Sequence, residues 1–185
     1  MSHSIRYKII DFLFQALAVR QYLIFSGCFF VLTALVMLIL NAQIMPVGCP
    51  GMIPLELAFT KGALGDIVNA CGADGVRAHQ IMIWVDYLFI ISYIGFLGNL
   101  LGSLVRHLEY EKALLYFSLP IYAGVLDIIE NTLLLIELSD TEGLSGVLIF
   151  LASLAALVKF LLLIAAIAIT IYYLFELITK KTQRT

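Results

Sequence analysis

Four stretches of this chain are long and apolar enough to cross a lipid bilayer, and this feature limits its fold more than any other. A helix needs about 20 consecutive apolar residues to cross the hydrocarbon core. The stretches cover residues 21–44, 81–105, 113–138 and 146–174. They are predicted to be helices because lipid offers no hydrogen-bond partners to the backbone, and a helix pairs its backbone groups internally. Continuous apolar runs such as LLLIAAIAITIYYLF also lack the alternation of polar and apolar residues that is typical of barrel strands.

The composition of the whole chain agrees with this prediction. Hydrophobic residues make up 62% of the 185 residues and charged residues 13%, and the mean hydropathy is +1.03. These values lie outside those of ordinary soluble domains. No long basic or acidic run accompanies the formal net charge of -2, so we expect no nucleic-acid partner. We expect a single integral membrane domain over residues 1–185, an all-α bundle of four transmembrane helices in the lipid bilayer.

Residues outside the spans predict how the chain lies in the membrane. Residues 4–19 place apolar side chains along one side of a helix with charged ones among them, which is typical of an interfacial amphipathic helix. Lysine and arginine in short loops favour the cytoplasmic side. On one side of the spans lie Arg6, Lys8, Arg20, Arg106, Lys112, Lys180, Lys181 and Arg184, and on the other only Lys61 and Arg77. Both termini are therefore predicted to be cytoplasmic in a multi-pass plasma membrane protein, which in a bacterium means the inner membrane.

The longest predicted loop, residues 45–80, lies on the outer side in this arrangement. Its second half spaces apolar residues as one face of a helix, and Gly72 follows at a position typical of a helix end. We therefore expect a short amphipathic helix across the outer end of the bundle. Its apolar face consists of Leu64, Ile67, Val68 and Cys71.

The three cysteines fall into two groups. Cys49 and Cys71 both lie in the outer loop, so a disulfide between them is our slight preference in an oxidising compartment. Two unpaired thiols are the alternative. Cys28, in the first span, is interpreted as a small buried apolar residue that stays reduced.

Polar residues inside the predicted spans gather on particular helix faces. In the third span, the segment VLDIIENTLLLIEL places Asp127, Glu130 and Asn131 on one side. In the fourth span, Lys159 continues a face of alanines, and small residues allow helices to approach closely. This spacing predicts that Lys159 points inward, at nearly the same depth as Asp127.

The second span has two polar or small-residue faces. Asp86 and Tyr93 share one side, whereas Gly95, Asn99 and Gly102 occupy roughly the opposite side. The first side is expected to join the cluster of the third and fourth spans. The second side is a candidate face for a membrane-protein partner or a second copy of the chain, through Gly95, Gly98 and Gly102.

The charges of the predicted cluster do not balance. Asp86, Asp127 and Glu130 face one lysine, and Glu56 lies towards the outer end. An isolated charge at the bilayer centre costs about 3 kcal/mol on insertion scales. At least one acid is therefore expected to be protonated or balanced by a bound cation or cationic ligand. The alternative is a structural ion pair that fixes helix register, although buried pairs are poor stabilisers compared with apolar packing.

Several other chemistries lack their residues. The histidines His3, His79 and His107 lie at the terminus and at opposite ends of the second span, so no pair can ligate a haem. The sequence contains no CxxC, HExxH or Glu-x-x-His motif and no phosphate-binding glycine loop. We therefore expect no metal and no cofactor.

Four motifs, LELAFT, WVDYLFIISY, LDIIENTLLL and LAALVKF, resemble those of a family of small bacterial four-span membrane proteins of uncharacterised function. The resemblance covers most of the chain and implies no activity. It implies only the positions at which the motifs fall, namely Glu56, Asp86, Asp127, Glu130, Asn131 and Lys159.

The predicted function is therefore a polar pocket, open outwards, that binds or processes a small polar molecule or a lipid head group. In a reaction, Lys159 would contact an anion or donate a proton, and Glu130 or Asp127 would act as the base; whether the protein is an enzyme stays open. One alternative is an accessory subunit or assembly factor of a larger membrane complex. Another is a proton-coupled transporter, which with four helices would act as an oligomer.

Overall fold

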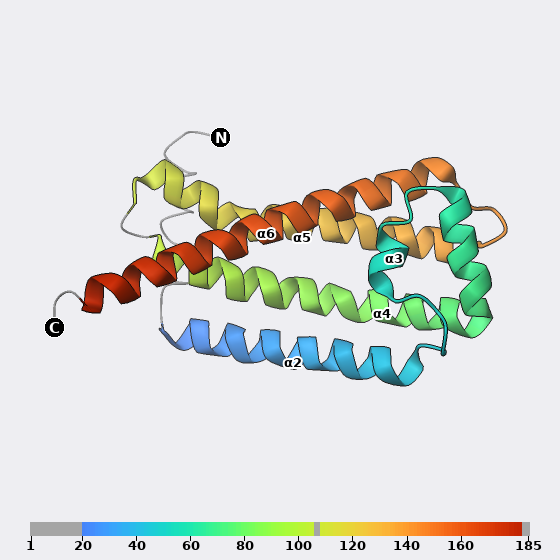
Figure 1. Ribbon diagram of the computed structural model, residues 1–185, viewed down its shortest axis with the longest axis horizontal. Coiled ribbons are helices and arrows are strands. Elements are labelled where there is room, and N and C mark those ends of the chain that lie inside the picture. The colour runs from blue at the N-terminus through green and yellow to red at the C-terminus, as the bar shows by residue number, and fades with distance from the viewer. Residues whose placement is uncertain (1–19, 106–107, 183–185) are drawn as a thin grey trace.

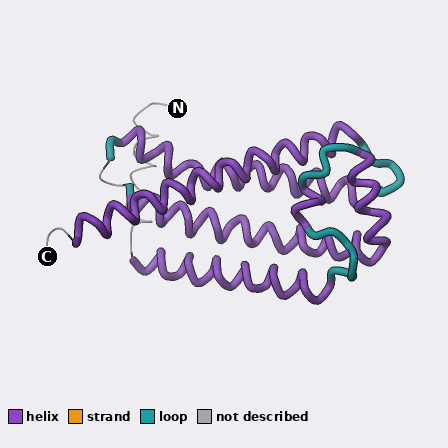
Figure 2. Tube along the Cα trace, in the orientation of Figure 1, coloured by secondary structure: helices purple, strands orange, loops and turns teal. Residues whose placement is uncertain are grey.

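The computed structural model describes residues 20–105 and 108–182, and in these ranges the chain forms helices and no strands (Figure 2). The predicted interfacial helix at residues 4–19 lies outside them. The helices, labelled in Figure 1, are α2 (Arg20–Ile44), α3 (Met52–Glu56), α4 (Lys61–Leu104), α5 (Tyr110–Ser139) and α6 (Gly146–Thr182).

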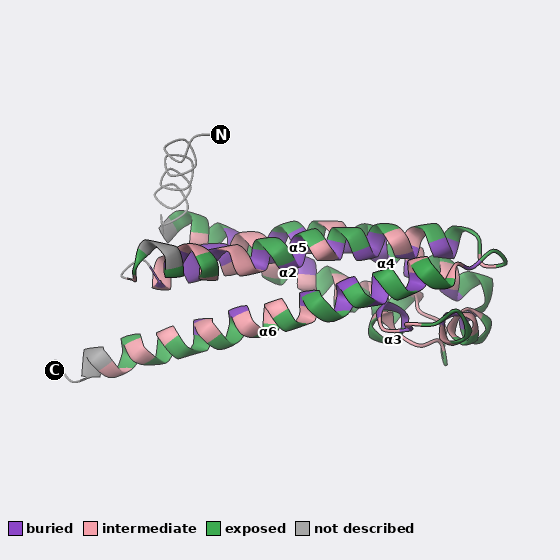
Figure 3. Ribbon diagram, turned by 90° about the horizontal axis from the view of Figure 1, so that it is seen from above, coloured by how far each residue is buried: buried purple, intermediate pink, exposed green. Residues whose placement is uncertain are grey.

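Four helices, α2, α4, α5 and α6, are long and apolar enough to cross a membrane. This confirms the predicted bundle of four apolar helices. They run side by side, and the start of α2 lies at the same end of the bundle as the end of α6 (Figure 1). Helix α4 packs against α2 and α5, and α6 packs mainly on α5. The last part of α6 diverges from the other helices and is largely exposed (Figure 3).

Helix α4 is much longer than the predicted second span. It begins at Lys61, where the side chain of Thr60 accepts a hydrogen bond from the backbone N–H of Ala63 at 3.2 Å. Inside it, Gly72 has φ 61° and ψ -173°, so the backbone turns there. Glycine adopts this conformation without strain. The chain therefore enters the next helix directly, and residues 73–80, predicted to be loop, are helical.

The short helix α3 was not predicted from the sequence. Five residues are too few to show an apolar period, and the surrounding glycines and prolines favour turns. After α3, the backbone N–H of Phe59 donates to Ser153 Oγ of α6 at 2.9 Å. Leu55, the residue before Glu56, is fully buried in an apolar cluster with side chains of α4, α5 and α6. These contacts fix α3 against the bundle.

The apolar core between α4 and α5 depends on a close approach of the two helices. Ile90, Tyr93 and Ala123 are buried there. A side chain at Gly124 would overlap with the end of the Ile94 side chain of α4, which would have to move, so the absence of a side chain at Gly124 favours this close crossing. On the second predicted face of α4, Asn99 Nδ2 donates to Ser26 Oγ of α2 at 3.3 Å.

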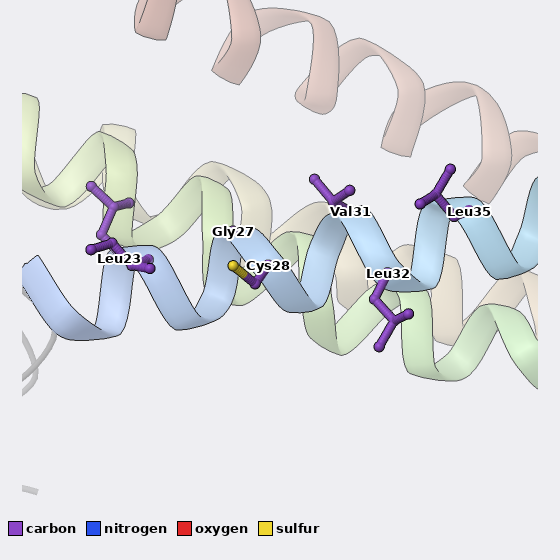
Figure 4. A pocket seen from close by; sticks show the side chains of 7 residues that line it. Leu23, Gly27, Cys28, Val31, Leu32 and Leu35 are labelled. Carbon is purple, nitrogen blue, oxygen red and sulfur yellow. The ribbon is translucent and has the colours of Figure 1, made fainter.

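Helix α2 is the least embedded of the long helices. Apolar residues line a groove on its surface, among them Leu23, Val31 and Leu35 (Figure 4). Cys28 also lines this groove and is exposed, with a free thiol. The prediction that Cys28 is buried was therefore wrong, because among the described helices α2 packs mainly on α4, and much of its remaining surface is exposed.

Candidate functional site

Lys159 of α6 lies at the centre of a buried group of acids. Its Nζ donates to Asp127 Oδ1 of α5 at 2.7 Å, and it lies 2.7 Å from Glu130 Oε2 and 3.3 Å from Glu56 Oε2 of α3. Only 3% of the lysine is exposed. The predicted buried ion-pair cluster between the third and fourth long helices is therefore confirmed.

The alanine face of α6 explains why Lys159 reaches these acids. Ala152, Ala155 and Ala156 are buried at the α5–α6 contact. Because their side chains are small, the two backbones approach closely along this face. The lysine, which continues the same face, then projects towards the acids of α5.

A second group of polar residues joins α4 to this centre. The Tyr93 hydroxyl donates to Asp127 Oδ2 at 3.0 Å, so both oxygens of Asp127 accept hydrogen bonds. Asn131 Nδ2 donates to Asp86 Oδ2 at 2.7 Å. Asn131 was predicted to share one side of the helix with Asp127 and Glu130, but unlike them it bonds to Asp86 of α4 and not to Lys159. It follows Glu130 directly and is therefore rotated by about 100° around α5, towards α4.

The cluster contains more acceptors than donors. Three carboxyl groups, those of Glu56, Asp127 and Glu130, contact one lysine, and a fourth, that of Asp86, accepts a hydrogen bond from Asn131. Glu130 Oε1 and Asn131 Oδ1 are buried and have no hydrogen-bond partner among the described residues. The contact between Glu130 Oε2 and Lys159 is short, but its angle does not make it a hydrogen bond, so we regard it as an ionic contact. A buried acceptor without a donor costs about 1–3 kcal/mol.

Glu56 differs from the other acids because it lies outside the long helices. Burial raises the pKa of its carboxyl, the charge of Lys159 opposes this rise, and the charge of Asp127 adds to it. The net direction is upward, so Glu56 holds a proton more readily than an exposed glutamate. The residue lies at the end of the cluster that α3 covers.

The polar cluster is closed in this structure. Glu56 is 7% exposed and Asp86 8%, and the other members are buried more deeply. Helix α3 covers the cluster at the end where the sequence predicts an outward opening. Lys159 is therefore not accessible from the surface in this conformation, and Glu56 of α3 is part of what encloses it.

Two residues that hold this cover were missed by sequence reasoning. Ser153 binds the backbone after α3, as described above. His79 is 1% exposed, and its ring nitrogens lie 2.9 Å from Gly75 O and 3.0 Å from Pro50 O. For Ser153, the only sign of this role in the sequence was a polar side chain on the apolar helix that carries Lys159. His79 gave none, because its partners are backbone carbonyls.

A disulfide joins Cys49 to Cys71, with their Cα atoms 4.4 Å apart. This is the pairing preferred from the sequence, and it ties the loop before α3 to the first part of α4. The sulfur atoms and a ring nitrogen of His79 all lie within 4.8 Å of one another. Metals bind cysteine in its thiolate form, and two cysteines joined in a disulfide have no thiolate. This group is therefore not a metal site while the disulfide is intact.

The glycines proposed as a partner face lie within the packing of this chain. Gly98 and Gly102 are buried. A side chain at Gly95 would first meet Ser26 of α2, and one at Gly98 would first meet Phe117 of α5. Both helices therefore occupy part of this face.

The long apolar helices and the buried charge cluster indicate a helical membrane protein with a polar centre. Comparisons with models of protein families, with curated proteins and with solved structures found no match. The function is therefore inferred from the geometry of the site.

Proposed function

We propose that this protein is an integral membrane protein that binds a small polar molecule or a lipid head group at the cluster around Lys159. The ligand carries a positive charge and N–H donors, as a primary ammonium group does. The observation that carries this proposal is the surplus of acceptors: three carboxyl groups contact one lysine, and Glu130 Oε1 and Asn131 Oδ1 have no donor among the described residues.

The chemistry of the site favours a cation over an anion. Lys159 is the only cationic side chain in contact with these acids among the described residues, and it is already shared by Asp127, Glu130 and Glu56. An added anion would meet carboxylates on every side. An ammonium group would supply both the missing charge and the missing donors, and such charge-assisted hydrogen bonds are stronger than neutral ones.

Helix α3 is the element that controls access in this proposal. Its residue Glu56 contacts Lys159 directly, so displacing α3 removes one acid and opens the cluster at the same time. The flanking loops carry the disulfide and the contact to Ser153. These anchors keep the cover attached while α3 moves.

We further propose that α3 lies on the outer side of the plasma membrane, the inner membrane in a bacterium, and that both termini are cytoplasmic. The distribution of lysine and arginine supports this orientation. It also agrees with the start of α2 and the end of α6 lying at one end of the bundle, opposite α3 (Figure 1). An interfacial helix at residues 4–19 would then lie on the cytoplasmic surface.

Binding of radiolabelled ethanolamine to the protein in nanodiscs tests the proposal. In phosphatidylcholine, whose head group has no N–H donor, we expect saturable binding of ethanolamine and none of neutral radiolabelled glycerol. If a lipid head group is the natural ligand, phosphatidylethanolamine in the nanodisc will compete with free ethanolamine. If a soluble amine is the natural ligand, phosphatidylethanolamine will not compete with free ethanolamine. Absence of saturable ethanolamine binding in phosphatidylcholine, together with no retention of phosphatidylethanolamine in native mass spectrometry, would refute the proposal.

A further inference from the structure

A second hollow in the bundle lies away from the Lys159 cluster, between α4 and α5. Its volume is about 360 Å³, which is within the usual range for small-molecule sites. The lining is almost entirely apolar, and includes Ile91 and Ile94 of α4 and Phe117 and Ile121 of α5. Gly95 and Gly98 also line it, and their lack of side chains leaves the space open.

Asn99 is the one polar side chain in this lining. It is 5% exposed, and its Nδ2 donates to Ser26 Oγ at 3.3 Å. The Ser26 hydroxyl in turn donates to Leu23 O at 3.2 Å, so it accepts from Asn99 and cannot donate to it. Asn99 Oδ1 is buried and has no partner among the described residues. Asn99 therefore brings an unpaired, buried acceptor to the lining of an otherwise apolar hollow.

The polar and the apolar lining of the hollow lie at different depths in the bundle. Asn99 is near the end of α4, roughly 7 Å from Leu104 at about 1.5 Å per residue. Ile94 and Ile91 follow deeper along the helix, and on α5 Ile121 is deeper than Phe117. The acceptor is thus closest to the head-group region, and the apolar lining extends from it towards the bilayer centre. Ile91 is 61% exposed and Ile121 is 37% exposed, so the hollow opens towards lipid.

We infer that this hollow binds a membrane-soluble alcohol, an apolar molecule with one hydroxyl group that donates to Asn99 Oδ1. Such a molecule places its hydroxyl at the membrane surface and its apolar body in the hydrocarbon core, which matches the order of groups in the hollow. An acyl chain without a donor would fill the space but leave Asn99 Oδ1 unpaired. The site is separate from the Lys159 cluster and does not depend on the function proposed for it.

Photolabelling of the full-length protein in phosphatidylcholine nanodiscs tests this inference. The probe is a long-chain primary alcohol with a diazirine in mid-chain and a terminal alkyne, and the matched control is its methyl ether. We expect the alcohol to label peptides containing Ile91, Ile94 and Ile121 about five-fold more than the ether, the difference that one net hydrogen bond supports. Equal labelling by the two probes would overturn the inference and show that bulk lipid alone fills the hollow.

Paired variants separate binding from packing. Asn99→Leu should reduce labelling by the alcohol to that by the ether, whereas Ser26→Ala, which breaks the same α2–α4 hydrogen bond but keeps Asn99 Oδ1, should preserve the difference. If Asn99→Leu does not fold, Ile91→Trp at the rim should lower labelling by the alcohol, and Ile128→Trp on another lipid-facing part of α5 should not. A preference for the alcohol that survives both Asn99→Leu and Ile91→Trp would place the binding elsewhere.

Discussion

At the scale of single residues, Lys159 is the group on which the cluster depends. Its ammonium group contacts Asp127, Glu130 and Glu56, and all of these side chains are buried. Removing one partner of a buried ion pair leaves an uncompensated charge, whereas replacing both partners by apolar residues often costs little. The two kinds of change therefore have different consequences for stability.

We predict that Lys159→Met lowers the free energy of unfolding by about 3–5 kcal/mol, because three acids lose their counter-charge. Adding Asp127→Leu should restore part of this loss, since the most directly paired acid is then also removed. Unfolding in mixed micelles measures both. The matched control is Lys112→Met, which removes an exposed pair with Glu109 and should change stability by less than about 1 kcal/mol. A Lys159→Met protein as stable as Lys112→Met would contradict the prediction.

Glu56 should make stability depend on pH. Its pKa is raised in the folded protein above the ordinary value of 4.5, mainly by burial. A group with a raised folded pKa binds its proton more tightly when folded, so its contribution is complete below the ordinary value and is lost as the pH rises through the folded pKa.

We therefore predict that the free energy of unfolding falls as the pH rises above 4.5, by at most about 1.4 kcal/mol per pH unit for this one group. Unfolding at a series of pH values should show a smaller slope in Glu56→Gln. The exposed acid in Glu142→Gln serves as the control and should keep the wild-type slope. An unchanged slope in Glu56→Gln would show that Glu56 does not take up the proton.

At the scale of elements, α3 is a cover held at both sides. The disulfide between Cys49 and Cys71 anchors the loop before it, and Ser153 of α6 binds the backbone after it. A helix of five residues has little stability of its own. Its position therefore depends on these anchors and on the buried Leu55.

We predict that replacing Cys49 and Cys71 together by serine lowers stability by about 3 kcal/mol, the chain-entropy value for a loop of this length, given their sequence separation of 22. Cys28→Ser, at the free thiol, is the matched control and should have little effect. Thermal unfolding with and without a dithiol reductant compares the three proteins. If reduction leaves the wild-type protein unchanged, the bridge does not stabilise the cover.

The long apolar helices were predictable because crossing a bilayer imposes their length and composition. Helical spacing also predicted that Lys159 faces Asp127 and Glu130, since these residues repeat along single faces. The position of α3 was not predictable, because it depends on contacts between residues far apart in the sequence, such as Phe59 with Ser153. The backbone does leave the helical conformation at Gly72, as expected for a helix end, but the helical start of residues 73–80 was missed because nothing in the sequence showed that the next helix begins directly after this turn.

At the scale of the whole molecule, the long helices present many apolar side chains outward, whereas the charged groups of the Lys159 cluster are buried between them. Many exposed residues of α2 and α6 are leucine, isoleucine, valine or phenylalanine, as expected for surfaces that contact lipid. The ends of the bundle differ, since α3 and the disulfide lie at one end and the start of α2 at the other (Figure 1). The orientation of these ends in the membrane decides from which side a ligand enters.

We predict that reporter fusions in a bacterial host show a cytoplasmic signal after Thr185 and an outer signal when inserted near Val47, an exposed position in the loop before α3. A fusion after Leu108, between α4 and α5, should again report the cytoplasm and serves as an internal control. An outer signal after Thr185 would contradict the proposed orientation.

The central claim is that the acids around Lys159 bind a cationic ligand and are not there for stability alone. Ethanolamine binding and unfolding, measured on the same preparations of wild-type protein and Glu130→Gln, test it most directly. The variant keeps the size of a fully buried side chain but replaces its carboxyl group by an amide, which cannot carry a negative charge. We predict that ethanolamine affinity falls at least about ten-fold, the effect of losing a hydrogen bond to a charged group. The free energy of unfolding should fall much less than in Lys159→Met, because Lys159 keeps Asp127 and Glu56 as partners. Unchanged affinity in Glu130→Gln, with a loss of several kcal/mol in stability, would show instead that the cluster is structural.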